Sequence, residues 1–178
     1  LFTLLLVVAM VGCNDDEKYE TIIDGETEIT YIPDDVFEEE LIRLGYDDNK
    51  DNWVPTKNIK NVEILDLKPR YSYQGPYIKD LKGIENGSKP KKLAFDGVKL
   101  ISLDLTNNLK LEHLEIKKNY DENFWDEDNS SYIGTLTSID ISKNKALKHL
   151  EINRSALYSL DISNNLALEH LTIRGELT

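Results

Sequence analysis

Three histidines stand at equivalent places in a repeated pattern, and two of them have a nearby carboxylate. His113, His149 and His170 each precede the leucine of an L-x-I stretch, and Glu115 and Glu151 follow within two of these stretches. Imidazole and carboxylate groups are common metal ligands, so such a ladder could bind a transition metal. Its charge could also change at about pH 6–7, where histidine gains a proton. Three solvated positions that share residue types because the repeat is duplicated would give the same pattern.

The segment 119–135, NYDENFWDEDNSSYIGT, is expected to form a loop at one edge and carries a second set of candidate residues. Tyr120, Phe124, Trp125 and Tyr132 lie there among acidic side chains. Aromatic rings beside carboxylates suit stacking on a sugar with hydrogen bonds to its hydroxyls, and they also suit a protein-binding anchor. The alternative is that these rings fold back and cover the edge of the domain.

Asp47, Asn49 and Asp51 are spaced like the start of a calcium loop of the EF-hand type. Such a loop requires Gly at its sixth position and Glu at its twelfth, where this chain has Asn52 and Asn58. The segment is therefore either a weak calcium candidate or a polar turn. No other cofactor is expected.

Asp104, Asp140 and Asp161 form another repeated column, and stacked carboxylates repel one another unless they are solvated or hydrogen-bonded. We expect each of them to accept hydrogen bonds from its own turn, because residues that recur with a repeat are typically structural. The sequence has no Gly-rich phosphate loop, no G-x-S-x-G motif and no HExxH motif. The chain is therefore predicted not to be an enzyme.

The one cysteine, Cys13, ends the apolar segment LFTLLLVVAMVG. Residues 1–12 have the character of a truncated signal peptide, and MVGC resembles a bacterial lipobox, which implies that Cys13 is lipidated. Residues 13–29 are rich in Asp and Glu and are expected to form an acidic tether. The net charge of −12 disfavours binding to nucleic acid. The expected location is the outer membrane, with the protein anchored by lipid and exposed at the cell surface.

A sequence repeat determines which elements position these residues. The stretches ISLDLTNNLKLEHLEI and YSLDISNNLALEHLTI are nearly identical, and a third copy lies between them. The period is 21 residues, with an insertion of about 15 residues after Asn119. A fixed period in this range is typical of solenoid proteins.

Each repeat contains the pattern LxxLxLxxN twice. The alternating L-x-L pairs predict short strands, and the following Asn is expected to bond backbone groups inside the coil, where water does not reach. Stacked coils would bury a continuous Leu and Ile core. The predicted fold is an α/β repeat, a solenoid of short parallel strands with two strands per unit, over residues 63–178.

These motifs resemble leucine-rich repeats, in the short nested bacterial form sometimes called IRREKO. The upstream text IPDDVFEEELIRLGYD resembles the N-terminal cap of leucine-rich-repeat surface lipoproteins of Bacteroidota. The resemblance implies a helical cap over residues 30–62. The residues expected to cap this helix or to lie on its apolar face are Asp34 or Asp35, Phe37, Leu41, Ile42 and Leu44.

The resemblance also implies an adhesin-type, non-catalytic binding module that recognises a protein through its repeat surface. Glycan capture through the aromatic insertion is the alternative, and a purely structural envelope protein is a third hypothesis. Under the first hypothesis His113, Glu115, His149, Glu151 and His170 contact the partner. Under the second, Trp125 is exposed and required.

Overall fold

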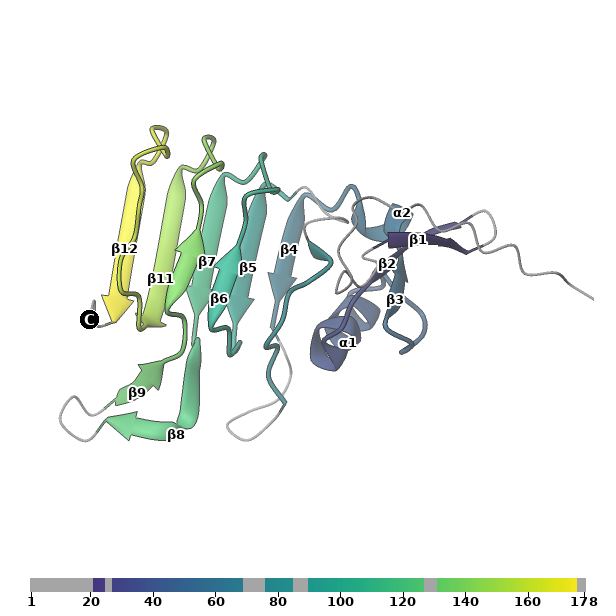
Figure 1. Ribbon diagram of the computed structural model, residues 1–178, viewed down its shortest axis with the longest axis horizontal. Helices are drawn as coiled ribbons and strands as arrows, with labels where there is room; N and C mark the ends of the chain where they lie inside the picture. The colour runs from purple at the N-terminus through teal and green to yellow at the C-terminus, as the bar shows by residue number, and fades with distance from the viewer. Residues whose placement is uncertain (1–20, 25–26, 69–75, 85–89, 127–130, 176–178) are drawn as a thin grey trace, which may run out of the picture.

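The computed structural model describes residues 21–24, 27–68, 76–84, 90–126 and 131–175 of the chain. The fold is α/β, with parallel sheets and few helices, as Figure 1 shows. Cys13 and the apolar segment before it lie outside the described residues. Across the part that is described, no helix is long and apolar enough to span a bilayer.

The N-terminal part combines a small antiparallel sheet with two helices. Strand β2 is central in the sheet and pairs with β1 and β3. The elements are β1 (Thr21–Asp24), β2 (Thr27–Tyr31), α1 (Asp35–Arg43), β3 (Trp53–Pro55) and α2 (Thr56–Ile59). The helical cap predicted over residues 30–62 is thus partly a β-structure.

Helix α1 forms where the sequence predicted it. Asp34 is its N-cap, and its Oδ1 accepts hydrogen bonds from the backbone N–H groups of Val36 at 3.0 Å and Phe37 at 2.9 Å. Phe37 and Leu41 are buried against the core, as expected for the apolar face. The helix therefore covers the first strand of the repeats.

Part of the segment predicted as an acidic tether, residues 13–29, forms strands instead. Residues from Thr21 to Asp24 and from Thr27 onward form β1 and β2, which pair as an antiparallel hairpin. The alternation of polar residues with Ile22 and Ile29 fits such a pair, and β3 completes it from a distant part of the sequence. The many Asp and Glu residues of this segment favoured the prediction of a tether over that of strands.

The main element is a five-stranded parallel sheet in the order β12-β11-β7-β5-β4. The register pairs His149 with His170 and with His113, so each strand lies beside its counterpart in the neighbouring repeat. The strands are β4 (Ile64–Leu67), β5 (Lys92–Asp96), β7 (His113–Lys117), β11 (His149–Ser155) and β12 (His170–Gly175).

A second, smaller parallel sheet contains β6 (Ser102–Asp104) and β10 (Ser138–Asp140), with Leu103 paired to Ile139. These are the first strands of two repeat units, and the main sheet holds the second strands. The matching segment of the third unit, around Leu160, forms no strand, so the prediction of two strands per unit is wrong there. Between the two sheets lies a core of buried Leu and Ile side chains such as Leu105, Leu114 and Ile116.

Asparagines of the repeat pattern are buried and bond backbone groups, as predicted, and these groups belong to the preceding repeat unit. The Nδ2 of Asn144 donates to the backbone oxygens of Leu105 at 3.0 Å and Asn108 at 2.8 Å. The Nδ2 of Asn165 makes the same pair of bonds, to the oxygens of Ile141 at 3.0 Å and Asn144 at 2.9 Å. The side chains thus satisfy carbonyl groups that no water reaches.

The insertion forms a β-hairpin where the sequence suggested a loop. Strands β8 (Tyr120–Asp126) and β9 (Ser131–Gly134) pair antiparallel, and the hairpin projects from one end of the parallel strands (Figure 1). The backbone N–H of Thr135 donates to the oxygen of Asn119 at 3.2 Å. The hairpin therefore begins and ends at nearly the same point of the coil.

Candidate functional site

The outward side chains of the five-stranded sheet lie on one face of the repeats. Along β7 the burial alternates, with Leu114 and Ile116 inside and their neighbours turned outward. We call the following set the outer sheet face: Asp66, Lys68, Lys92, Asp96, His113, Glu115, Lys117, His149, Glu151, Asn153, His170, Thr172 and Arg174. It holds four acidic and four basic residues, so it is neutral in a chain of net charge −12.

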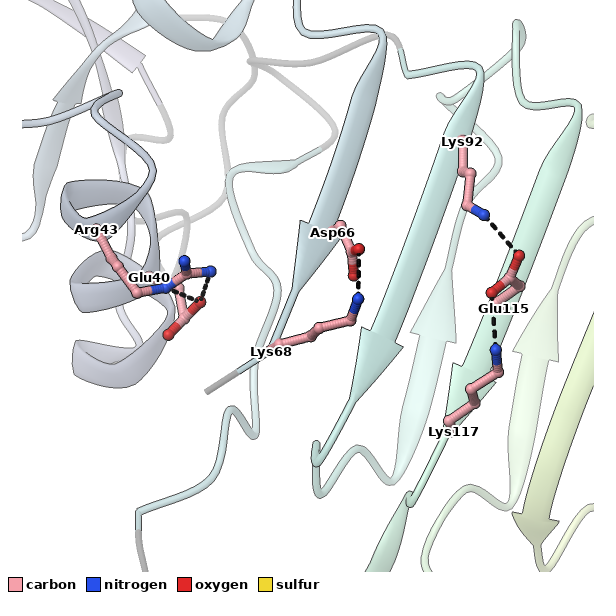
Figure 2. A network of polar contacts seen from close by, with 7 residues as sticks. All are labelled: Glu40, Arg43, Asp66, Lys68, Lys92, Glu115 and Lys117. Carbon is pink, nitrogen blue, oxygen red and sulfur yellow. Dashed lines mark hydrogen bonds and ion pairs between the residues drawn. The ribbon is translucent and has the colours of Figure 1, made fainter. Parts of the chain in front are cut away.

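Glu115 lies at the centre of an ion-pair network on this face, which Figure 2 shows. Its Oε1 is 2.6 Å from the Nζ of Lys92 on the neighbouring strand, and its Oε2 is 3.0 Å from the Nζ of Lys117. The hydrogen bond from Lys92 is the largest cause that lowers the pKa of Glu115 to about 2, and Lys117 adds to it. This carboxylate is therefore ionised and held in place at neutral pH.

The predicted histidine ladder is present in the geometry. The ring centroids of His113 and His149 are 5.9 Å apart, and those of His149 and His170 are 5.8 Å apart. The Nε2 of His149 lies 3.9 Å from the Oε2 of Glu151, whose Oε1 accepts a hydrogen bond from Asn153 at 2.7 Å. In the part of the chain that the structure describes, no three His, Cys, Asp or Glu side chains are placed to hold a metal ion.

The column of repeated aspartates has the structural role that the sequence indicated. Asp104, Asp140 and Asp161 each accept, through Oδ1, the backbone N–H two residues later, at 2.8, 2.9 and 2.8 Å. These turns lower the pKa of Asp140, mainly through the backbone N–H of Ser142, and the pKa of Asp161, mainly through the Ser163 hydroxyl. The column holds turns and offers no catalytic pair.

The calcium candidate, Asp47, Asn49 and Asp51, lies in a loop organised by a carboxylate from α1. Glu38 is fully buried, and its Oε1 accepts hydrogen bonds from the backbone N–H groups of Asp51 at 2.9 Å and of Asn52. Burial is the main cause that raises the pKa of Glu38 and that of Asp47. The Glu38 carboxylate thus holds the turn, while its Oε2 and the Oδ2 of Asp47 are buried without a hydrogen-bond partner among the described residues.

The aromatic candidates of the insertion have a described backbone only. Tyr120, Phe124 and Trp125 belong to β8 and Tyr132 to β9, and Trp125 is the register partner of Tyr132. Their side chains lie outside the described parts of the structure. The hairpin nevertheless brings these residues together at a projecting element.

Sequence reasoning missed a groove of about 830 Å³ beside β6. Its lining includes Lys79, Lys82, Lys99, Ile101, Ser102 and Asp104. Segment 76–84 lies within the predicted solenoid but outside the regular 21-residue period, so only its placement in three dimensions reveals that its lysines line this groove. A cluster of lysines in an acidic chain was the one available signal.

Comparisons with known proteins identify no relative. No family model matches the chain, and no curated protein and no solved structure matches it either.

Proposed function

We propose that this chain is a non-catalytic binding module, a leucine-rich-repeat solenoid that recognises a protein partner through the outer sheet face. The solenoid is supported by strands that pair at the period of the repeat and by the asparagine bonds between coils. A repeat of this kind offers a broad, rigid surface, which suits a protein ligand better than a small molecule.

The observation that carries the proposal is the charge balance of the outer sheet face. A net charge of −12 would repel many protein surfaces, whereas this face is neutral and its central carboxylate is held by two lysines. Polar groups that are fixed before binding lose less conformational entropy when a partner docks. The face is thus suited to specific contacts with a protein.

The proposed location is the outer membrane, through a lipid on Cys13. The support is the apolar segment that precedes this cysteine and the lipobox-like text MVGC. With such an anchor, the repeats would face the surroundings of the cell, where a protein partner on another cell or in a matrix is accessible.

The test is a binding array that carries matrix proteins and polysaccharides. Labelled wild-type protein is compared with His149→Ala/Glu151→Ala, which alters the outer sheet face, and with Lys57→Gln, an exposed substitution on α2 that serves as the control. Binding to a protein spot that falls at least about tenfold in the double variant supports the proposal. Equal binding by both variants would remove the outer sheet face from consideration.

Glycan capture is the second candidate, because β8 and β9 place Trp125 opposite Tyr132 on a projecting hairpin. The same array includes Trp125→Ala. A polysaccharide signal that this variant loses, while the outer-face variant keeps it, would favour glycan capture over protein recognition.

A further inference from the structure

The groove beside β6 exists because a neighbouring segment is held away from that strand. Ile78 still forms a parallel bridge with Val98, and its oxygen accepts the backbone N–H of Lys99 at 2.8 Å. Directly afterwards, the backbone N–H groups of Lys79 and Asp80 donate to the Oδ2 of Asp34 at 2.8 and 3.0 Å. Asp34, the cap of α1, thus binds the backbone of residues 79–80 at a position away from β6.

Among the described residues β6 pairs with β10 alone, so its other edge has no described strand beside it. Next to this pair, the oxygen of Ile101 accepts the N–H of Thr137 at 2.8 Å. Because backbone groups of successive residues in a strand point to opposite edges, Ser102 and Asp104 present theirs to the other side. Both residues line the groove. An open strand edge inside a groove is a template for another strand.

The charges of the groove indicate what kind of strand fits. Lys79, Lys82 and Lys99 line it, together with two aspartates that already hold turns: Asp80 accepts the N–H of Lys82, and Asp104 accepts that of Thr106, both at 2.8 Å. The local excess of positive charge contrasts with the net charge of −12 for the whole chain. An anionic ligand is therefore complementary to this part of the molecule.

The apolar lining favours a peptide over a sugar. Ile101 is 68% exposed at the groove, where an apolar side chain of a bound strand would cover it. Among the described residues no aromatic ring lines the groove, so a sugar ring would find no stacking platform.

We propose that the groove binds an extended acidic peptide of a partner protein, which adds as a strand to the open edge of β6 while its carboxylates contact Lys79, Lys82 and Lys99. This site is separate from the outer sheet face, so failure of either proposal leaves the other unaffected.

The first experiment measures the fluorescence polarisation of a labelled octapeptide that alternates glutamate with valine. We expect saturable binding that weakens as salt is added. Binding to Lys79→Gln/Lys82→Gln should be about tenfold weaker, because each solvent-exposed charge contact contributes only a modest free energy of binding. The matched control Lys57→Gln/Lys145→Gln removes two exposed charges outside the groove and should bind like the wild type. No binding, or equal losses in both double variants, would overturn the site.

The second experiment tests the strand addition itself. The same octapeptide with all its backbone amides N-methylated cannot donate hydrogen bonds to β6 in any register, and we expect it to bind at least about tenfold more weakly. Amide exchange at Ser102 and Asp104 should slow when the unmodified peptide is bound. Undiminished binding of the methylated peptide would overturn the pairing. Stronger competition by an oligogalacturonate than by the unlabelled octapeptide would assign the groove to acidic sugars instead.

Discussion

Glu115 shows how a residue that looks like a ligand-binding group in the sequence acquires a structural role. Lys92 and Lys117 come from two adjacent strands and hold both of its oxygens (Figure 2). A partner that binds the outer sheet face would meet a fixed pattern of charge there.

Replacing Glu115 with Gln should lower the free energy of unfolding by about 1–2 kcal/mol at pH 7, because it removes the ion pairs with Lys92 and Lys117. The loss is this small because solvent screens part of a surface ion-pair network. The folded pKa of about 2 lies below the ordinary value of 4.5, so the stabilisation is complete above pH 4.5. It is lost as the pH falls through the folded pKa. Urea unfolding at pH 7 and at about pH 3 measures this, with Glu169→Gln as the control. A loss of equal size at both values would contradict the ion-pair account.

Glu38 should give the opposite dependence of stability on pH, because burial raises its pKa. The folded state then binds more protons than the unfolded state between the ordinary and the raised values, so stability falls as the pH rises through that window. Glu38→Gln should flatten this dependence and leave stability at pH 7 unchanged or higher, since no buried charge remains. Unfolding measured across pH 5–8 tests this against Asp48→Asn, an exposed control. Parallel curves for wild type and Glu38→Gln would disprove the linkage.

At the scale of the elements, Asp34 joins the cap to the repeats. One carboxylate oxygen caps α1 and the other holds the backbone of Lys79 and Asp80. A motif that appeared in the sequence as a helix start therefore also fixes one wall of the groove.

We expect Asp34→Ala to destabilise the protein by about 2–3 kcal/mol, since it loses the cap and leaves two further N–H groups without their acceptor. Asp35→Ala, at the exposed neighbouring position, should change stability by less than about 0.5 kcal/mol. Thermal and urea unfolding measure both. Equal effects would show that Asp34 contributes only general helix-dipole stabilisation.

The hairpin of the insertion should be removable. Joining Asn119 directly to Thr135 restores the regular period of the repeat, and the two residues are already linked by a 3.2 Å backbone hydrogen bond. The excised protein should keep its circular dichroism spectrum and cooperative unfolding. Gly134 packs so closely on Arg154 that a Cβ there would meet backbone atoms, so a modest loss from this contact is expected. Loss of cooperative unfolding would show that the hairpin is part of the core.

At the scale of the whole molecule, we expect stability to depend on contacts between neighbouring repeat units. The asparagine bonds and the continuous apolar core connect each coil to the next, and the cap covers the first strand. A substitution in a central repeat unit should thus weaken the coupling between the repeats before it and after it, and also lower the total stability.

Asn144→Ala should lower the free energy of unfolding by about 2–4 kcal/mol, because the oxygens of Leu105 and Asn108 lose a buried donor. Amide exchange should speed up in β11 and β12 more than in β5. The control is Asn164→Ala at an exposed position of the next turn. Uniform acceleration over all strands would indicate global unfolding and contradict the coupling between coils.

The sequence by itself determined the parallel strands, their register and the role of the buried asparagines, because a repeat forces equivalent residues into equivalent environments. It also located α1 and its cap, which depend on local patterns. Only the tertiary structure decided the rest. The pairing of β1, β2 and β3 joins distant short segments, Glu38 organises a loop from another element, and the groove arises where segment 76–84 leaves β6. Such features depend on contacts of segments outside the regular 21-residue period, and no periodicity in the sequence encodes those contacts.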